Sequence, residues 1–362
     1  MAMNKMKSAI ALSSLAAAVL TFTGCGSDDT TAPAGGSGSV SCLDGTVLSG
    51  DCTSDVTLTK GTQWEIDGLV KIKDGATLTI EAGTTVYGKE GANYIVVTKG
   101  SKIMAEGTAA EPIIFTSDIA KDEQSKGEIA QWGGLTLLGD APTNHTDAHY
   151  EVDESDDDFA FGGTNAADNS GVIKHVKILN SGKQVSTDLE INGLSLAGVG
   201  SGTVIEDVEV INSSDDCVEI WGGTVNVSRI EMTNCNDDGF DLDYGYVGAA
   251  TDITVHMTSA GAHSGFEISS GGDTPMTSPT ITNFSIVKEA GTDDGGIYIK
   301  DDTTAPKFVD GTIRFAAGDV TFKTKKALTS AQFRDISFTN VTSDPAPATA
   351  SGNGATDILT LF

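Results

Sequence analysis

Two pairs of adjacent aspartates recur in closely similar segments of the 362-residue sequence. Asp215 and Asp216 lie in NSSDDCVEI (212–220), and Asp237 and Asp238 lie in NCNDDGFDL (234–242). Like-charged carboxylates on neighbouring chain segments raise one another's pKa, and hydrolysis of a glycoside needs one acid and one base. The candidate catalytic residues of an enzyme are therefore Asp215, Asp216, Asp237 and Asp238, together with His263 further along the chain.

The same stretch supports a second chemistry, because clustered carboxylates supply the hard oxygen ligands that calcium prefers. The candidate calcium ligands are Asp215, Glu219, Asp237, Asp241 and Asp243. The spacing of an EF-hand is not present. A third interpretation stays open, in which the paired aspartates occupy corners and only accept local backbone hydrogen bonds.

Short strands are expected to position these residues. Segments in which apolar and polar residues alternate recur along the chain, and Gly, Asn or Asp separate them. GATLTIE (75–81) is echoed by GSKIMAE (100–106), and DGFDL (238–242) is echoed by SGFEI (264–268). Such echoes predict an all-β solenoid, a right-handed parallel β-helix with about three strands per coil. The residues expected to point inward are Val218, Ile220, Phe240, Leu242, Phe266, Ile268, Ile297 and Ile299, and the interleaved Glu219, Asp241 and Glu267 are expected to point outward.

Charge limits the partners of the chain. There are 22 Lys and Arg against 51 Asp and Glu, which gives a formal net charge of -29. A surface of this sign repels nucleic acid and anionic membranes, so we expect no nucleic-acid partner. An acidic excursion near 140–170 breaks the repeat and is expected to be a surface loop.

The N-terminus carries the features of an export signal. Two lysines precede an apolar run from Ala9 to Leu20, which is too short to span a bilayer. The segment FTGC that ends at Cys25 resembles the bacterial lipobox, and the resemblance implies a signal peptide over 1–24 and a lipidated Cys25. Gly26 follows the cysteine, which by the same resemblance favours anchoring in the outer membrane. An ordinary cleaved signal is the alternative.

Residues 25–40 are predicted to form the lipidated end and a flexible linker, and 41–362 a single β-helix domain. Four cysteines remain in the domain, an even number in an oxidising compartment. Two disulfides are expected, Cys42 with Cys52 at the first loop and Cys217 with Cys235 between adjacent repeats. Four free thiols are the alternative.

The body from about Leu69 to Ile299 resembles a group of secreted and lipoprotein bacterial β-helix proteins with a pectate-lyase-like fold. The motifs that carry the resemblance are ATLTIEAGT (76–84), PIIFTS (112–117), WGGL (132–135), NGL (192–194), DD (215–216) and WGGT (221–224). The resemblance implies the fold and little about chemistry.

A partial resemblance to polygalacturonase-type glycoside hydrolases rests on DDCV (215–218), NDDG (236–239) and AHSG (262–265). The second element stands after the first rather than before it, and YIK (298–300) lacks the arginine of the family's Arg-Ile-Lys. One coil of separation also places backbones about 5 Å apart, below the ~6.5–9.5 Å between the carboxyl groups of an inverting hydrolase.

These features favour a non-catalytic lipoprotein of the cell envelope, periplasmic or surface-exposed, that binds a glycan or another envelope component. Its expected partners are the outer membrane, through the lipid on Cys25, and a polysaccharide. The alternative is a polysaccharide-cleaving enzyme that uses aspartates on stacked coils.

Overall fold

The computed structural model describes residues 42–121, 127–153, 155–186, 189–258, 262–272, 274–289, 294–315, 319–328 and 335–362. These residues belong to one compact unit that begins at Ser41. The predicted signal peptide, Cys25 and the linker lie outside the described residues. Among the described residues no helix is both long and apolar enough to cross a membrane.

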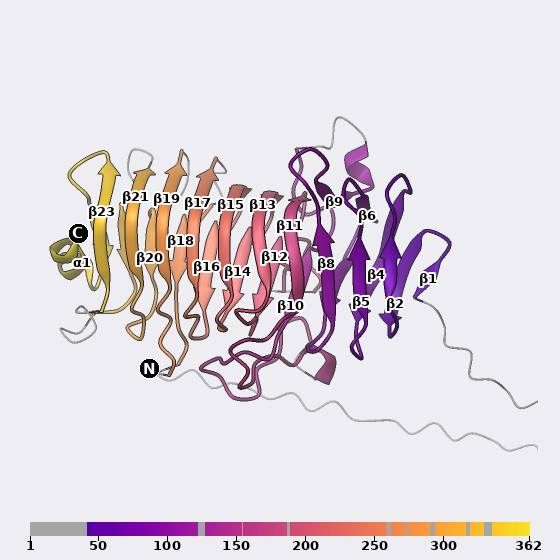
Figure 1. The fold of residues 1–362 in the computed structure, drawn as a ribbon. Coiled ribbons are helices and arrows are strands. Elements are labelled where there is room, and N and C mark those ends of the chain that lie inside the picture. The colour runs from indigo at the N-terminus through magenta and orange to yellow at the C-terminus, as the bar shows by residue number, and fades with distance from the viewer. Residues whose placement is uncertain are drawn as a thin grey trace, which may run out of the picture. The chain divides into compact units, whose positions relative to one another are not determined.

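The unit is a right-handed parallel β-helix, as predicted, with its coils stacked from β1 to β23 (Figure 1). The first coils contain β1 (Leu43–Asp44), β2 (Val47–Cys52), β3 (Val56–Leu58), β4 (Trp64–Ile72), β5 (Thr77–Ile80), β6 (Thr85–Gly88), β8 (Lys102–Glu106) and β9 (Ile113–Ser117). Strands β1 and β2 pair antiparallel, and the pairs between successive coils are parallel.

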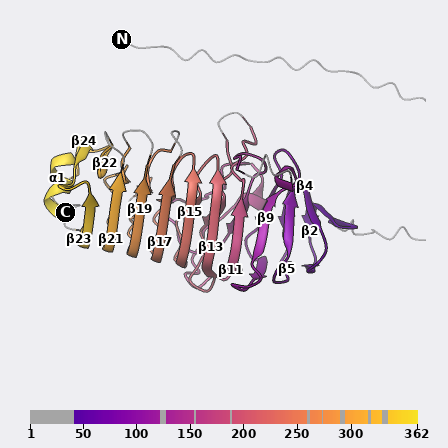
Figure 2. The same ribbon diagram turned by 90° about the horizontal axis from the view of Figure 1, so that it is seen from above.

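From β10 onward, short and long strands alternate along the chain, and β7 is an earlier short strand in line with β10. The short strands are β7 (Tyr94–Val97), β10 (Leu135–Leu138), β12 (Leu194–Ala197), β14 (Val218–Trp221), β16 (Phe240–Asp243), β18 (Phe266–Ile268), β20 (Ile297–Ile299), β22 (Phe322–Thr324) and β24 (Ala350–Gly352). The long strands are β11 (Gly171–Leu179), β13 (Val204–Ser213), β15 (Asn226–Cys235), β17 (Ala249–Met257), β19 (Thr280–Lys288), β21 (Lys307–Phe315) and β23 (Ser337–Asp344). The long strands lie side by side on one face of the solenoid (Figure 2).

Each long strand from β13 to β21 is bent near its middle by a residue in the left-handed region, and β13 and β15 have a second such residue near their ends, Asn212 and Asn234. The residues near the middle are Asp207, Arg229, Asp252, Asn283 and Asp310, with φ between 53° and 58°. The bend divides the strand in two, so each coil has the three segments that the repeat predicts. Asp and Asn take this conformation more readily than other residues with a Cβ, and they occupy four of these five corners instead of glycine.

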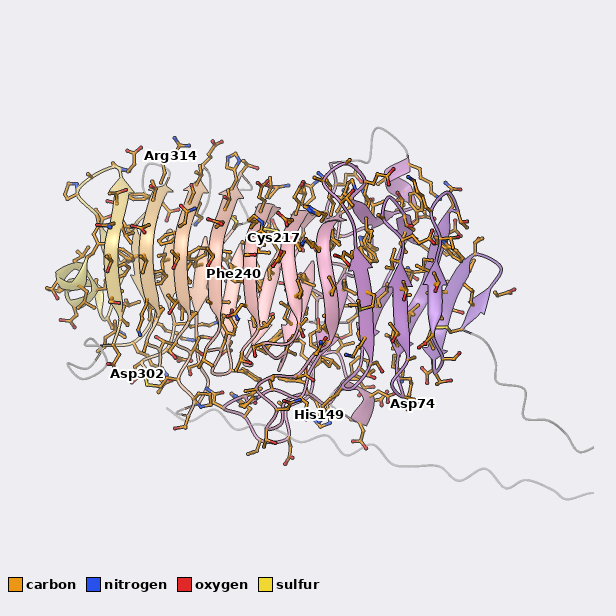
Figure 3. All side chains as sticks on the ribbon, viewed as in Figure 1. Asp74, His149, Cys217, Phe240, Asp302 and Arg314 are labelled. Carbon is orange, nitrogen blue, oxygen red and sulfur yellow. A yellow bond between two sulfur atoms is a disulfide. The ribbon has the colours of Figure 1, made fainter. Side chains whose placement is uncertain are left out.

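The predicted inward residues all lie in the core. Val218, Phe240, Phe266 and Ile297 follow one another in register, and each is at least 98% buried. Phe240 also contacts Phe266 edge to face, with the ring centres 5.9 Å apart, and lies within the solenoid (Figure 3). The C-terminal end of the stack is covered by α1 (Ala355–Leu361), which buries Ile358.

Both expected disulfides are present. The Cys42 and Cys52 sulfurs are 2.03 Å apart, and the Cys217 and Cys235 sulfurs are 2.08 Å apart. The second bridge ties adjacent repeats, as predicted. Cys217 lies in the first of the two echoed segments and Cys235 in the second, where Cys235 is the register partner of Ser213 on the previous coil.

The excursion after β10 is more than a surface loop. Besides the short η2 (Asp157–Phe159), it contributes Tyr150, Phe159 and Phe161 to a second apolar cluster on the outer side of the short strands. These aromatic residues are at least 95% buried, and Tyr150 packs edge to face on Trp221 with ring centres 5.2 Å apart. Apolar packing therefore holds the excursion against the sheet.

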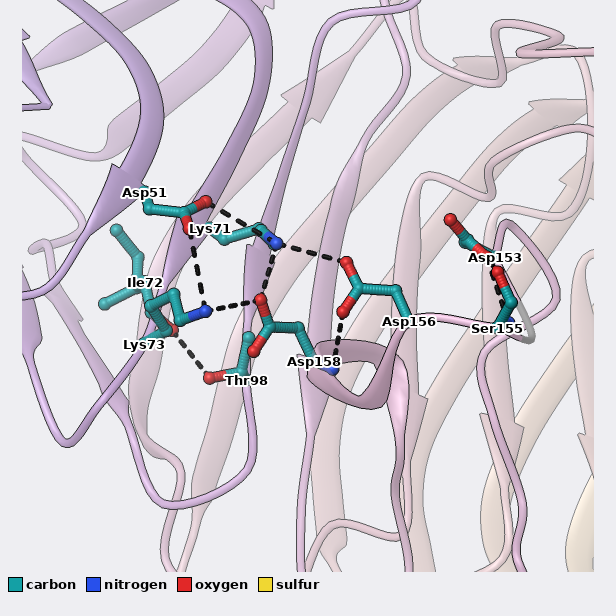
Figure 4. A network of polar contacts seen from close by, with 9 residues as sticks. All are labelled: Asp51, Lys71, Ile72, Lys73, Thr98, Asp153, Ser155, Asp156 and Asp158. Atoms are coloured by element: carbon teal, nitrogen blue, oxygen red, sulfur yellow. Dashed lines mark hydrogen bonds and ion pairs between the residues drawn. The ribbon is translucent and has the colours of Figure 1, made fainter.

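Ion pairs also hold the excursion at η2, next to the apolar contact of Phe159 (Figure 4). Lys71 Nζ of β4 lies 2.5 Å from Asp158, 3.2 Å from Asp156 and 3.5 Å from Asp51. Lys73 Nζ lies 2.6 Å from the same Asp158. Burial raises the pKa of the Asp158 carboxyl, but the two lysines outweigh burial and the pKa is lowered.

Candidate acidic site

The short strands place three acidic residues in one row. Glu219 of β14, Asp241 of β16 and Glu267 of β18 are direct register partners on successive coils. They face away from the aliphatic core, as predicted. They are nevertheless only 9%, 9% and 5% exposed, and segments outside the sheet lie beside Glu219 and Asp241.

These segments are the excursion and the chain before β12. Glu151, Gln184 and Glu190 line a depression of about 450 Å³ together with Asp215, Asp216, Glu219, Asp237 and Asp241. Seven of its eight lining residues carry a carboxyl group. We call this depression the acidic site. Glu151 and Glu190 were not among the predicted residues, since neither belongs to a repeated segment.

Asp216 and Asp238 precede β14 and β16 and also connect the coils. The Asp238 backbone N–H donates to Asp216 Oδ1 over 2.8 Å, and the Ser264 N–H donates to Asp238 Oδ1 over 2.6 Å. The Ser264 hydroxyl also donates to Asp238 Oδ1 over 2.5 Å. The third interpretation expected such backbone hydrogen bonds, but Asp216 and Asp238 accept them from the next coil, whereas Asp215 accepts one locally from Asp216.

Burial and mutual repulsion raise the pKa of Asp215 and of the buried carboxyls beside it. Burial first, and then the charges of Asp237 and Glu190, raise the pKa of Asp215 to about 7. Burial and the neighbouring carboxylates hold the pKa values of Asp216, Glu219, Asp238 and Asp241 well above their ordinary values. At neutral pH these carboxyls favour bound protons or a bound cation.

Few donors face these carboxyls. The Asn192 amide donates to Glu219 Oε2 over 2.6 Å, Lys300 pairs with Glu267, and His263 pairs with Asp237. Among the described residues, no hydrogen-bond donor reaches the buried Asp241 Oδ1. A buried carboxylate oxygen without a partner is costly unless a proton or a metal ion satisfies it.

The carboxylate oxygens come together in three overlapping triplets. Within each triplet, one oxygen of every residue lies within 4.8 Å of the others. The triplets are Asp215 with Asp216 and Asp237, Asp216 with Glu219 and Asp241, and Asp238 with Asp241 and Glu267. Of the five predicted calcium ligands, four fall in these triplets.

Asp243 is the exception. It ends β16 beside Trp221, and its Oδ1 accepts the Tyr244 N–H over 2.6 Å. The triplets instead include Asp216, Asp238 and Glu267, which the sequence analysis did not assign as calcium ligands. Glu267 occupies the position equivalent to Asp241 in the next repeat. This equivalence in the sequence could have identified Glu267 as a further candidate ligand.

These distances bear on the candidate chemistry. Carboxyl groups of an inverting glycoside hydrolase stand about 6.5–9.5 Å apart, which leaves room for a water molecule. Oxygens within 4.8 Å of one another leave no such room inside a triplet, but they suit a shared proton or a shared cation.

The match to a known family model agrees with the fold. The pectate-lyase-like β-helix domain matches residues 50–360. A comparison with curated proteins finds no match. Among solved structures, the enzymatically active domain of tailspike protein 2 from bacteriophage CBA120 is similar at 13% identity and a TM-score of 0.32, over 79% of this chain and 39% of that one. The full-length tailspike protein 2 from an Escherichia coli bacteriophage is similar at 10% identity and a TM-score of 0.27, over 79% and 38%.

This chain thus spans less than half the length of either tailspike protein. The family match covers nearly the whole described body, from β2 to α1. The chain belongs to the pectate-lyase-like β-helix family.

Proposed function

We propose that this protein binds an extracellular polysaccharide at the acidic site, with a divalent cation, calcium in the first place, held among the carboxylates. The observation that carries the proposal is Asp241. Its Oδ1 is buried and receives no hydrogen bond from the part of the chain that the structure describes, and the residue belongs to two of the three carboxylate triplets.

The donor set fits a calcium ion. Calcium takes six to eight oxygen ligands in flexible geometry, and carboxylates are its usual protein ligands. Asp216, Glu219 and Asp241 supply three oxygen ligands at the centre of the acidic site. Asn192 donates a hydrogen bond to one carboxylate oxygen of Glu219, which fixes the orientation of the carboxylate and leaves its other oxygen for the ion. A bound cation would also offset the repulsion that raises the pKa values of these carboxyls.

The depression fits a hydroxyl-rich chain. Its lining is almost entirely made of acceptors, and sugar hydroxyls donate to carboxylates and coordinate calcium. An anionic polysaccharide would be repelled by the acidic site unless the cation lay between them. Binding is therefore expected to depend on the cation.

The test is a calorimetric titration of the purified full chain with calcium at pH 7.5, followed by a glycan array with calcium or with chelator. Asp241→Asn keeps the shape of the side chain and removes its charge, and calcium affinity should fall by about tenfold or more. Asp74→Asn is the matched control, because Asp74 is exposed and lies far along the solenoid from the acidic site (Figure 3). No calcium heat and no cation-dependent glycan on the array would refute the proposal.

Cleavage of the polysaccharide is a second candidate, and Asp215 is the residue that favours it. A carboxyl with a pKa of about 7 can act as a general acid at neutral pH. Lys300 is a poor base, because Glu267 outweighs the effect of burial and raises its pKa. Asp215→Asn should abolish the release of reducing ends from a polysaccharide panel. Release that persists in this variant would exclude Asp215 as the acid.

We further infer that the protein is held at the outer membrane by a lipid on Cys25, exposed to the periplasm or the cell surface. The position of Cys25 directly after the apolar run supports this proposal. Expressed in a bacterial host with labelled fatty acid, the full chain should carry label and sediment with outer membranes. Cys25→Ala should lose both properties, and label that remains would refute the assignment.

A further inference from the structure

The bend of the long strands forms a groove on a different face from the acidic site. Two adjoining hollows of about 540 and 380 Å³ lie along it and share Arg229 and Glu231. One wall of the larger hollow is the row of left-handed corners, which consists of Arg229, Asp252, Asn283, Asp310 and Asn340. We call this feature the corner groove. It runs along the solenoid axis across the long strands that Figure 2 shows side by side.

The corner row presents paired amide and carboxylate groups. Asn283 Nδ2 donates to Asp252 Oδ1, and Asn340 Nδ2 donates to Asp310 Oδ1 over 2.9 Å. Each such bond uses one of the two amide hydrogens and one of the two carboxylate oxygens. Every pair therefore keeps a donor and acceptors for a ligand, and their side chains are already held in place by each other.

A row of hydroxyl groups forms the opposite wall. Thr254, Ser285, Thr312 and Thr342 are register partners on four successive coils, and all four line the same hollow. Neighbouring strands stand about 4.8 Å apart, so the hydroxyl groups repeat at that interval. A ligand that matches both walls must itself repeat along the axis and must offer hydroxyl groups to both sides.

The charges along the corner groove further restrict the class of ligand that can bind. Arg229 is the positive residue of the larger hollow, and it is already paired with Asp207 over 2.7 Å and with Glu206 over 2.8 Å. Asp252, Asp310 and Glu231 remain as carboxylates along the groove. A chain of uronic acids would meet repulsion here, whereas a neutral sugar chain would not.

We propose that the corner groove binds a neutral linear glycan that lies parallel to the solenoid axis. This second site goes beyond the cation-dependent site proposed above, since it uses other residues, on the long strands, and needs no metal ion. Amide and carboxylate groups of the corner row bind the sugar hydroxyls from one side, and the Thr and Ser hydroxyls bind them from the other.

The test uses the purified full chain on immobilised cello-, xylo-, malto- and mannohexaose, with a galacturonan hexamer for comparison, all in chelator. Retention of at least one neutral hexamer and none of the galacturonan is expected. In the double variant Asn283→Gly with Asp310→Gly, glycine adopts the φ values of 54° and 53° without strain. The loss of two hydrogen-bonding side chains should weaken retention about tenfold.

Two controls separate this site from the acidic site and from misfolding. Asp74→Gly removes a side chain at the same left-handed φ, 58°, outside the corner groove, and should bind as the unmodified chain does. Asp241→Asn should also retain the neutral hexamer unchanged. If the double glycine variant does not fold, Thr254→Val with Thr312→Val removes hydroxyls from the other wall at conserved shape and should weaken retention as well.

The proposal is overturned if none of the neutral hexamers is retained in chelator, or if a folded groove variant retains them undiminished. It is also overturned if Asp241→Asn abolishes retention, because the acidic site would then be the place of binding. If the chain retains a neutral hexamer in chelator but shows no calcium-dependent glycan binding, the proposal for the acidic site is refuted and the proposal for the corner groove is supported.

Discussion

The carboxyls of the acidic site should make the stability of the protein fall as pH rises when no divalent cation is present. Asp215 is the residue whose change can be worked out. Its pKa is 3.8 in the unfolded chain and about 7 in the folded protein. Between these values the folded state binds more protons than the unfolded state, so the free energy of unfolding decreases with increasing pH. The loss of stability caused by Asp215 is absent below about pH 4 and complete above about pH 7.

The size of the effect follows from the shift. One pKa unit corresponds to about 1.4 kcal/mol, so a shift of about three units costs about 4 kcal/mol between pH 4 and pH 7. Asp216 and Glu219 act with the same sign, because their pKa values are also raised. Since these groups repel one another, their contributions do not add independently. Even Asp215 alone is a large part of the 5–15 kcal/mol typical of a folded domain.

Urea denaturation at pH 5, 6.5 and 8 measures this dependence directly, in chelator and in calcium. In chelator the urea midpoint should fall steadily from pH 5 to pH 8. Calcium at about one hundred times its dissociation constant should restore about 2.7 kcal/mol at pH 8. Asp215→Asn should flatten the dependence and raise the midpoint at pH 8, whereas Asp74→Asn should change neither.

An equal urea midpoint at pH 5 and pH 8 in chelator would refute the reasoning. It would mean that the carboxyls of the acidic site are solvated or paired in the folded protein and that no proton or cation is needed there. A steep dependence that survives in Asp215→Asn would instead assign the effect to the more deeply buried Asp216 and Glu219.

Three further changes test the scaffold around the acidic site. Cys217→Ser removes the disulfide that joins the repeat of Asp215 to the next one and should lower the free energy of unfolding by about 3 kcal/mol in urea. Phe266→Ala leaves a cavity in the fully buried aromatic stack and should cost about 3–5 kcal/mol by the same measurement. Lys71→Met removes the main partner of Asp158, and limited proteolysis should then cut the excursion faster at an unchanged core stability.

The fold was predictable because a parallel solenoid translates sequence echoes directly into spatial rows. Residues at equivalent positions of the two echoed segments, such as Val218 and Phe240, become register partners in the structure. The alternation along each strand then assigns one row to the core and the next to the outside. Local pattern is enough for these assignments, because every coil contacts mainly its two neighbours.

The burial of the acidic row could not be predicted in this way. It depends on Tyr150 and Phe159 of the excursion, which pack on short strands that are distant in the sequence and follow no repeat. The same packing brings Glu151 to the acidic site. The role of Asp216 as an acceptor for the Asp238 N–H likewise depends on the exact stagger of two coils, and an offset of residues does not determine that stagger.

The row of left-handed corners and the row of Glu219, Asp241 and Glu267 differ in how their charges are arranged, and this difference argues for a ligand in the acidic site. Along the corner row, each carboxylate is followed by a residue that neutralises or bonds it, as Arg229 does for Asp207 and Asn283 does for Asp252. Stacking at about 4.8 Å makes such alternation the simple way to avoid repulsion between like charges. The row of Glu219, Asp241 and Glu267 does not alternate, although it is far better shielded from water, where repulsion is stronger. This fold separates its carboxylates at an exposed corner but stacks them in a buried row. It is stable at neutral pH when protons or a cation are bound in the buried row. Calcium titration of the full chain decides whether protons or a cation are bound there.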